Sequence, residues 1–318
     1  MRRTLLQQKE TGRTAGLALA LGNFDGLHRG HALVLQKAKQ CALEAGLTPG
    51  VLLFDEHPKQ VLFGEAPPLL MTGEEKRALL EEAGFTVLTL SFRQTKDLSP
   101  TAFVRLLRET YHARVLCCGA NYRFGRDAVG TADTLRALCP DYALTLYVVP
   151  DEVYRGALIS STRIRAAVER GEIEDANAML LRPFSYRLPV AAGDRRGKQL
   201  GFPTVNQYFL PAMVRPCAGV YASKVVLNGV CYAAVTNIGV RPTIGTGTFH
   251  SETHILGFSG DLYGRQVRVT LLRYLRQEQK FPDLDALRAA VTADAAAAKE
   301  VLNAYEQAPE AAGESSLL

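Results

Sequence analysis

Hydrophobic positions in the first half of the chain alternate between short apolar runs and longer stretches of helical period. The apolar runs predict buried strands at residues 17–21, 51–54, 86–90, 115–118 and 144–149. The segments between them predict helices at residues 31–45, 72–83 and 99–107. Strands that alternate with helices indicate an α/β domain with a doubly wound parallel sheet.

Residues that begin and end helices support these boundaries. Thr72 followed by Glu75 is typical of a capping box, and Ser99 followed by Pro100 supplies an N-cap and a first-turn proline. Gly46 and Gly84 stand where the first two helical patterns stop. Glycine is common just after a helix, so both helices are expected to end there.

The pattern changes after Arg182-Pro183. Residues 219–226 and 230–238 are β-rich and are joined through Asn228-Gly229, a strong hairpin signal, and 251–256 and 266–274 continue the pattern. This half predicts a compact antiparallel β-barrel, followed by an alanine-rich helix over 283–304. The expected domains are therefore residues 1–182 and 183–306, with a flexible tail at 307–318.

Composition narrows the class of protein. The 318 residues are 47% hydrophobic, which is typical of a soluble globular protein, and no apolar run reaches the length of a membrane span. The net charge of +5 without a long Lys/Arg stripe suits anionic small ligands at least as well as nucleic acid. The six cysteines contain no Cys-x-x-Cys pair, so we expect reduced thiols in a cytoplasmic protein. The oligomeric state stays open.

Residues 22–31, Gly-Asn-Phe-Asp-Gly-Leu-His-Arg-Gly-His, follow the first predicted strand. Ligands of parallel sheets bind at the carboxyl ends of the strands, which favours a site in this loop. His28 and His31 stand at the turn into a helix, where both imidazoles can face a phosphate at the helix N-terminus. The competing interpretation is a glycine-rich turn with two surface histidines.

A second candidate phosphate segment is residues 159–165, Ile-Ser-Ser-Thr-Arg-Ile-Arg. Ser160 and Thr162 stand at the start of a predicted helix, where hydroxyls can cap the helix and also donate to phosphate, and Arg165 adds a cation. Alone, the segment is better explained as a serine N-cap with solvated arginines. Together with the histidine string, it favours a phosphate site.

The second half has its own candidate site at residues 197–206, Gly-Lys-Gln-Leu-Gly-Phe-Pro-Thr-Val-Asn. The segment is not a Walker A loop, because Gly-Lys-Ser/Thr is absent. Thr204 and Asn206 are two residues apart and fall on one side of an extended strand. Their oxygens suit Mg²⁺ and phosphate, although a Pro-Thr turn with a capping Asn explains the fragment equally well.

The first-half motifs resemble a known family. Residues 28–31 resemble the His-x-Gly-His signature of the nucleotidyltransferase superfamily, and 159–165 its second phosphate motif. The wider pattern, including 54–58 and 119–125, is similar to the adenylyltransferase module of the bacterial bifunctional riboflavin kinase/FAD synthetases. That family usually has Pro where this chain has Glu56.

The second half resembles the riboflavin kinase module of the same family. The matching residues are 219–221, 237–243, 252–256, 260–264 and 278–281. Family members commonly have an acidic residue where this chain has Gly257. The resemblance extends from about residue 17 to about residue 298, which is nearly the whole chain.

The resemblance implies two reactions that use ATP as co-substrate and Mg²⁺. The second half would phosphorylate riboflavin to FMN, and the first would adenylylate FMN to FAD with release of pyrophosphate. It implies catalytic residues His28, His31, Arg165 and Glu252, with Glu252 as general base toward the riboflavin 5′-hydroxyl. It implies Mg–ATP binding at Thr204 and Asn206, and nucleotide binding at Asn23, Phe24, Asp25, Gly26, Ser160, Thr162, Gly197, Lys198 and Gly201. Flavin contacts are implied at Phe54, Pro58, Asn121 and Phe124.

Two alternatives compete with this hypothesis. One is a single-activity adenylyltransferase of another acceptor, such as pantetheine phosphate or nicotinate mononucleotide, and the kinase-like second half argues against it. The other is a flavin-binding regulatory protein with inactive sites. The presence of His28, His31, Thr204, Asn206 and Glu252 argues against that loss of activity.

Overall fold

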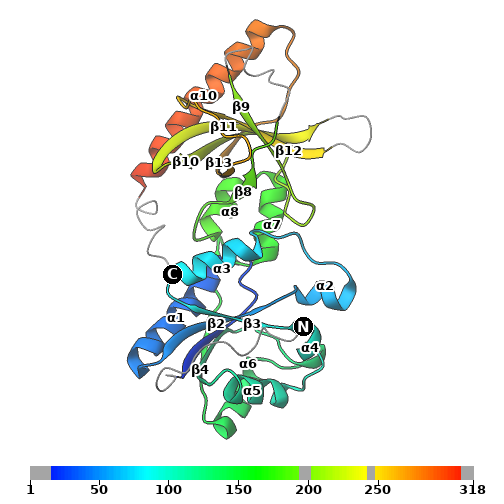
Figure 1. Cartoon of the computed structure of the whole chain (residues 1–318), viewed down its shortest axis with the longest axis vertical. Helices are drawn as coiled ribbons and strands as arrows, with labels where there is room; N and C mark the ends of the chain where they lie inside the picture. The colour runs from blue at the N-terminus through cyan, green and yellow to red at the C-terminus, as the bar shows by residue number, and fades with distance from the viewer. Residues whose placement is uncertain (1–15, 193–201, 242–247, 309–318) are drawn as a thin grey trace. The chain divides into compact units, whose positions relative to one another are not determined.

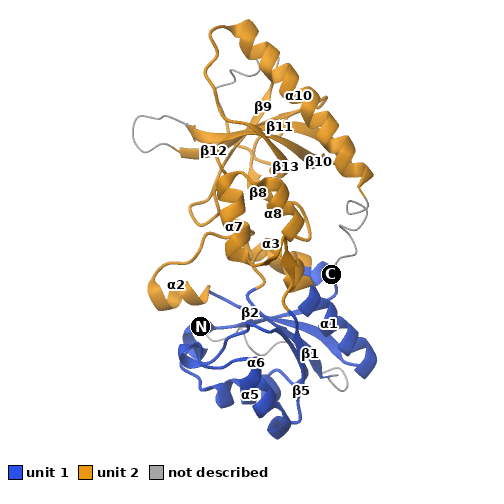
Figure 2. Ribbon diagram, turned by 180° about the vertical axis from the view of Figure 1, so that it is seen from behind, with its two compact units in different colours: residues 1–23, 33–56, 80–150 blue, residues 24–32, 57–79, 151–318 orange. Residues whose placement is uncertain are grey.

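The computed structural model describes residues 16–192, 202–241 and 248–308. It contains two compact units, which Figure 2 shows in blue and orange. The first unit comprises residues 1–23, 33–56 and 80–150, and the second comprises residues 24–32, 57–79 and 151–318. The domain boundary predicted at residue 182 separates two stretches of sequence, whereas each compact unit combines several stretches. The predicted boundary stays a prediction.

The first unit is built on a parallel five-stranded sheet. In sequence, its strands are β1 (Leu17–Leu21), β2 (Thr48–Phe54), β3 (Thr86–Leu90), β4 (Ala113–Gly119) and β5 (Thr145–Val149). The order across the sheet is β3-β2-β1-β4-β5, and every pair is parallel. All five strands coincide with predicted apolar runs, so the doubly wound α/β class is confirmed.

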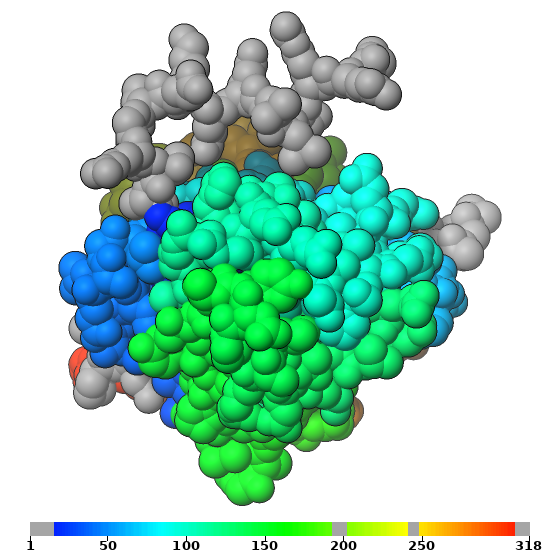
Figure 3. Space-filling view, turned by 90° about the horizontal axis from the view of Figure 1, so that it is seen from below, coloured from blue at the N-terminus to red at the C-terminus, as the bar shows by residue number. Residues whose placement is uncertain are grey.

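Helices flank this sheet. They are α1 (Arg29–Ala45), whose first turn belongs to the second unit, α4 (Phe92–Thr95), α5 (Pro100–Glu109) and α6 (Ala132–Leu138), with short 3₁₀ turns at Arg126–Ala128 and Cys139–Tyr142. Buried Leu19, Leu116, Leu107 and Leu135 bring β1, β4, α5 and α6 into one core. In the space-filling view of Figure 3, α1 is at the blue edge and the segments that include α5 and α6 are cyan to green.

Helix ends confirm the predicted caps. The Ser99 Oγ accepts a hydrogen bond from the Ala102 N–H at 3.2 Å, and the Thr72 Oγ1 accepts one from the Glu75 N–H at 3.2 Å. Gly46 and Gly84 have φ of 64° and 84°, the left-handed conformation in which glycine ends a helix without strain.

The second unit contains a near-closed antiparallel barrel. Its strands are β8 (Ser185–Pro189), β9 (Thr204–Tyr208), β10 (Gly219–Leu227), β11 (Val230–Arg241), β12 (Thr248–Ile255) and β13 (Gln266–Arg276). Their order is β8-β13-β10-β11-β12-β9, and a bridge between Ala191 and Asn206 brings the two edges together. Asn228 and Gly229 have φ of 51° and 80°, as a two-residue type I′ hairpin requires. The predicted barrel is confirmed.

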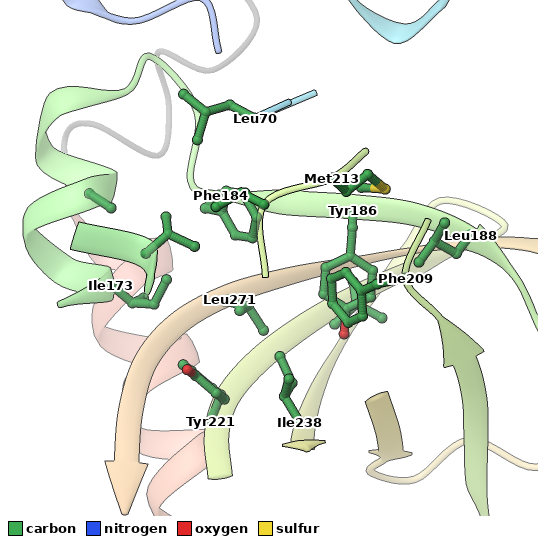
Figure 4. Close-up of a cluster of buried hydrophobic side chains, with 14 of the residues drawn as sticks. Leu70, Ile173, Phe184, Tyr186, Leu188, Phe209, Met213, Tyr221, Ile238 and Leu271 are labelled. Carbon is green, nitrogen blue, oxygen red and sulfur yellow. The ribbon is translucent and has the colours of Figure 1, made fainter. Parts of the chain in front are cut away.

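Alternate residues of β10 face opposite sides of this sheet. Tyr221 points into the barrel core with Ile238 and Leu271 (Figure 4). Ala222 faces outward and packs against Ala298 of α10 (Leu284–Gln307), the long orange-to-red helix of Figure 1. The helix continues through Gln307. Residues 309–318 of the predicted tail lie outside the described residues, so the tail stays a prediction.

The remaining elements of the second unit connect the barrel to the histidine loop. They are α2 (Pro58–Phe63), most of α3 (Gly73–Glu82), the β6–β7 hairpin (Val153–Tyr154 and Ala157–Leu158), α7 (Ser161–Arg170) and α8 (Ile173–Met179). Cys41, Cys117, Cys118 and Cys139 are buried free thiols, whereas Cys231 is exposed. No helix within the described ranges has both the length and the apolar character needed to cross a membrane.

The parallel sheet predicts a large difference between two leucine truncations. Leu116 of β4 is 0% exposed, whereas Leu43 of α1 is 87% exposed. Leu116→Ala removes buried contacts and leaves a cavity, so we expect a loss of about 2–5 kcal/mol in unfolding free energy. Leu43→Ala is the control and should change it by less than about 0.5 kcal/mol. Thermal scanning of both proteins measures the difference, and equal melting temperatures would contradict the assigned core.

Candidate active sites

The loop after β1 has an unusual backbone. Phe24, Gly26 and Leu27 have φ of 52°, 80° and 44°, so three of four consecutive residues are left-handed. Non-glycine residues adopt this conformation only where their surroundings enforce it. Two constraints favour glycine at position 26. Its φ is left-handed, and a Cβ there would lie 2.7 Å from the Leu70 Cδ1. The loop therefore has one tightly determined shape, which leads into α1.

His28 and His31 come together at the start of α1. Their rings stack with centroids 3.5 Å apart and planes 16° apart. The His28 Nδ1 accepts a hydrogen bond from the His31 N–H at 3.3 Å. In the neutral ring the proton is therefore on Nε2, where it can be donated to a ligand. The first turn of α1 contains no acidic residue, so its positive helix end is not neutralised there.

Both histidines favour the neutral form. Burial is the main cause that lowers the pKa of His28 from 6.5 to about 4, and the nearby Arg165 charge lowers it further. Burial, the neighbouring His28 and Lys76 hold the pKa of His31 well below its usual value. At neutral pH the site therefore offers uncharged imidazole donors.

Asp25 and Arg165 form a buried ion pair. The Arg165 Nη2 donates to the Asp25 Oδ2 at 2.6 Å, and the two side chains are 10% and 7% exposed. The Arg165 Nε donates to the Pro68 carbonyl at 2.6 Å, and the Leu70 N–H donates to the Asp25 Oδ1 at 3.2 Å. Removing one partner of such a pair leaves an uncompensated buried charge, so each holds the other in place.

The N-terminus of α7 contacts the same loop. The Ser160 Oγ caps the helix by accepting from the Arg163 N–H at 3.2 Å, and the Ser161 Oγ donates to the Asp25 carbonyl at 2.9 Å. Thr162 is exposed. The structure thus brings Asp25, His28, His31 and Arg165 together, and it adds Ser161, which the sequence analysis did not select.

Lys76 and His57 also lie within electrostatic range of this cluster. Burial is the main cause that lowers the pKa of Lys76, and the nearby Asp25 charge opposes that shift. Burial is also the first cause of the lowered pKa of His57, with Asp25 raising it and Arg165 lowering it. Sequence reasoning missed both, because Lys76 looks like an ordinary helix residue and His57 stood only as part of a motif.

The predicted flavin residues are divided between the units. Phe54, at the end of β2, contacts the Phe92 ring edge-on with centroids 5.1 Å apart. Phe124 is buried in the first-unit core between Phe103 and Tyr122. Asn121 is exposed and Pro58 opens α2 in the second unit. Their roles in flavin binding stay predictions.

Two residues depart from the family pattern, and each has a local structural role. The Glu56 carboxylate pairs with Arg93, whose Nε donates at 2.5 Å. Gly257 has φ of 75°, so it forms a left-handed turn after β12 that glycine accommodates without strain.

The second candidate site lies on one face of the barrel sheet. Asn206 of β9 is directly opposite Glu252 of β12, which is in turn opposite Asn237 of β11. Opposed residues share a face, so the three side chains form a row across three strands. Thr204, two residues before Asn206, is opposite His254 on the same face. The pairing thus unites Thr204, Asn206 and Glu252, as the sequence analysis expected.

Further polar groups border this row. The Asn237 Nδ2 donates to the Glu278 Oε1 at 2.8 Å, and the His250 Nε2 is 3.4 Å from the Glu252 Oε1. The contact with Glu252 is the main cause that raises the pKa of His250. His250 was not selected from the sequence, and Asn237 and Glu278 stood only within matching segments. Strand register brings Asn237 opposite Glu252, and Glu278 reaches the row through its bond to Asn237. Gly197, Lys198 and Gly201 lie outside the described residues.

The two halves match different protein-family models. A riboflavin kinase model matches residues 180–302, and a FAD synthetase model matches residues 10–163. Histidines 28 and 31 fall within the second match, and Thr204, Asn206 and Glu252 fall within the first. The fold and the two sites therefore define a two-module transferase.

Similar whole chains combine the same two modules. The bifunctional riboflavin kinase/FMN adenylyltransferase of Pseudomonas fluorescens is 36% identical over 89% of this chain and 92% of its own length. The protein of the same name from Haemophilus influenzae is 34% identical over 91% and 95%. This chain belongs to the bifunctional riboflavin kinase/FMN adenylyltransferase family.

A solved structure agrees with the fold. A Streptococcus pneumoniae protein titled a macrolide-efflux protein superimposes with a TM-score of 0.83 at 29% identity, covering 91% of this chain and 95% of that one. The likeness extends over both modules, so the whole two-module architecture has a solved counterpart.

The low pKa of His28 predicts a pH-dependent stability. Between pH 6.5 and about 4, the unfolded state binds a proton at His28 that the folded state excludes. Stability is therefore lost as the pH falls through this window, by at most about 1.4 kcal/mol per pH unit for this group. His28→Asn retains an acceptor for the His31 N–H and does not titrate, so its melting temperature should fall less steeply than that of the wild type.

Melting temperatures at about pH 7.5 and about pH 5 measure this difference. The matched control is His112→Asn, because His112 is exposed and its φ of 53° suits asparagine. The control should follow the wild-type curve. Parallel curves for the wild type and His28→Asn would contradict a buried neutral histidine at this position.

Proposed function

We propose that the histidine loop and the barrel face are the two active sites of consecutive flavin transfers. As a bifunctional riboflavin kinase/FMN adenylyltransferase, the chain phosphorylates riboflavin to FMN with ATP and adenylylates FMN to FAD. The observation that supports the site assignment best is the grouping of His28, His31, Asp25 and Arg165 at the start of α1. The two reactions differ in which phosphorus of ATP is attacked.

In the first site, a phosphate oxygen of FMN attacks the α-phosphorus of ATP. The new P–O bond forms as the bond to the β-phosphate oxygen breaks, and pyrophosphate leaves. This reaction needs positioning and charge stabilisation more than covalent help from the protein. Neutral His28 and His31 donate N–H bonds to the phosphates, and the developing negative charge favours their protonation. Ser160 and Thr162 close over the phosphates from the start of α7.

Arg165 supplies the fixed positive charge of that site. Its Nε and Nη2 are bonded to Pro68 and Asp25, which leaves Nη1 without a bond to any described residue. The guanidinium is therefore held in one orientation before ATP arrives. Asn23, Phe24, Asp25 and Gly26 shape the nucleotide side of the loop, and Phe54, Pro58, Asn121 and Phe124 are the flavin-side candidates.

In the second site, Glu252 is the general base. It accepts the proton of the riboflavin 5′-hydroxyl as that oxygen attacks the γ-phosphorus of ATP, and ADP leaves. Side-chain exposure of 41% leaves Glu252 accessible to a substrate. His250, at 3.4 Å, orients this carboxylate from the same strand.

Thr204 and Asn206 fit a Mg²⁺–ATP site. The Asn206 Oδ1 is buried and has no hydrogen-bond partner among the described residues, so an uncompensated oxygen stands where a hard cation would be satisfied. The Thr204 hydroxyl stands two residues earlier on the same face. Bound Mg²⁺ would neutralise charge on the ATP phosphates. Gly197, Lys198 and Gly201 are proposed to bind the nucleotide from the preceding segment.

His28→Ala tests the first site. It removes a preorganised donor, so we expect a loss on the order of 2–4 kcal/mol of transition-state stabilisation, roughly 30- to 1,000-fold in kcat/KM for adenylylation of supplied FMN. Chromatography of flavin products measures FAD. Riboflavin phosphorylation by the same sample is the control for folding and should be unchanged. Near-normal FAD formation would refute the role of His28.

Glu252→Gln tests the second site. The amide cannot accept the hydroxyl proton, so we expect FMN formation from riboflavin to fall by roughly 100-fold or more. Adenylylation of supplied FMN should be spared in the same protein. Glu174→Gln, at an exposed ion pair with Arg273, is the matched control. Loss of both activities in Glu252→Gln would instead indicate misfolding or strong coupling between the domains.

A further inference from the structure

An extended segment, residues 68–70, contacts both modules within the second unit, and we call it the 68–70 strap. In an extended chain, successive residues direct their backbone groups to opposite sides. The Pro68 carbonyl and the Leu70 N–H point to one side and bind Arg165 and Asp25, at 2.6 and 3.2 Å. The strap thus supplies one acceptor and one donor to the ion pair of the first site.

The other side of the strap binds the riboflavin kinase module. The Leu69 N–H donates to the Ala212 carbonyl at 2.7 Å, and the Val214 N–H donates to the Leu69 carbonyl at 3.0 Å. These bonds form an isolated parallel bridge between Leu69 and Met213. Residues 212–214 belong to the connection that follows β9, the strand that contains Thr204 and Asn206.

Buried side chains pack against the 68–70 strap on both of its sides. Leu70 is 3% exposed, and it packs so closely over Gly26 that no Cβ fits there. Met213 and Val214 are 4% and 0% exposed, and Leu70 and Met213 belong to one hydrophobic cluster with Phe184 and Tyr186 (Figure 4). A displacement of residues 212–214 would therefore move Leu69, and with it both groups that hold Asp25 and Arg165.

We propose that the 68–70 strap couples the kinase module to the adenylyltransferase site by positioning the Arg165 guanidinium and the Asp25 carboxylate. The inference rests on the proposed role of Arg165 in adenylyl transfer. Leu69 touches no reacting group, so it is a positioning residue. A misplacement of about 1 Å in such a site can reduce a rate on the order of 100-fold. Backbone pairing in the kinase module would thereby set the rate of FAD formation.

A double-mutant cycle on the full chain tests this coupling. Leu69→Pro removes the N–H that binds Ala212, whereas Leu69→Ala keeps the backbone bonds and is the matched control. Arg165→Lys keeps the charge but loses the forked bonds to Pro68 and Asp25. The measured quantities are kcat and KM for adenylylation of supplied FMN in the wild type, the single variants and Leu69→Pro/Arg165→Lys.

We expect Leu69→Pro to lower kcat about tenfold in the wild-type background and by less than about twofold in the Arg165→Lys background. Leu69→Ala should stay within about twofold of the wild type, and riboflavin phosphorylation should be retained in every variant. Equal losses in both backgrounds, or no loss in either, would overturn the coupling while leaving the proposed function intact. A wild type that makes no FAD would refute the proposed function, and the inference with it.

A second variant covers the case in which Leu69→Pro does not fold, as judged by lost riboflavin phosphorylation. Val214→Pro removes the other cross-module bond from the kinase side, and Val214→Ala is its control for lost packing. The same dependence on Arg165 is expected. Additive losses for Val214→Pro and Arg165→Lys would overturn the inference.

Discussion

The buried ion pair between Asp25 and Arg165 is the interaction on which the first site depends. A charge removed from water is stable only with a partner and satisfied hydrogen bonds, and these two side chains provide both for each other. The pair joins a loop after β1 to α7, which are 140 positions apart in sequence. Asp25 lies in that loop among the left-handed residues Phe24, Gly26 and Leu27.

Under the proposed assignment, the two sites would bind phosphate in different ways. The first combines a helix N-terminus with buried, neutral imidazoles, whose low pKa values follow from desolvation. The second uses a row of side chains on a sheet face, where strand register alone brings Asn206 and Glu252 together. The proposal therefore assigns attack at the α-phosphorus to a buried helix N-terminus and attack at the γ-phosphorus to an exposed sheet face.

Local patterns predicted the elements well where short-range physics decides. Five apolar runs became the parallel strands, Ser99 became an N-cap, and Asn228-Gly229 became a hairpin turn. The short helix α2 and the β6–β7 hairpin were missed. The hairpin is held by bonds from the Arg163 guanidinium to the carbonyls of Tyr154 and Ala157, which no local pattern encodes.

By itself, the sequence determined the two modules, their order and most of the candidate chemical groups, because motifs and hydrophobic period are local properties of the chain. Tertiary structure decided which groups act together. It paired Asp25 with Arg165 and stacked the His28 ring on the His31 ring. It also placed Lys76 within electrostatic range of Asp25 and residues 68–70 against the Asp25–Arg165 pair. These relations depend on burial and on contacts between distant segments, and both exist only once the chain has folded.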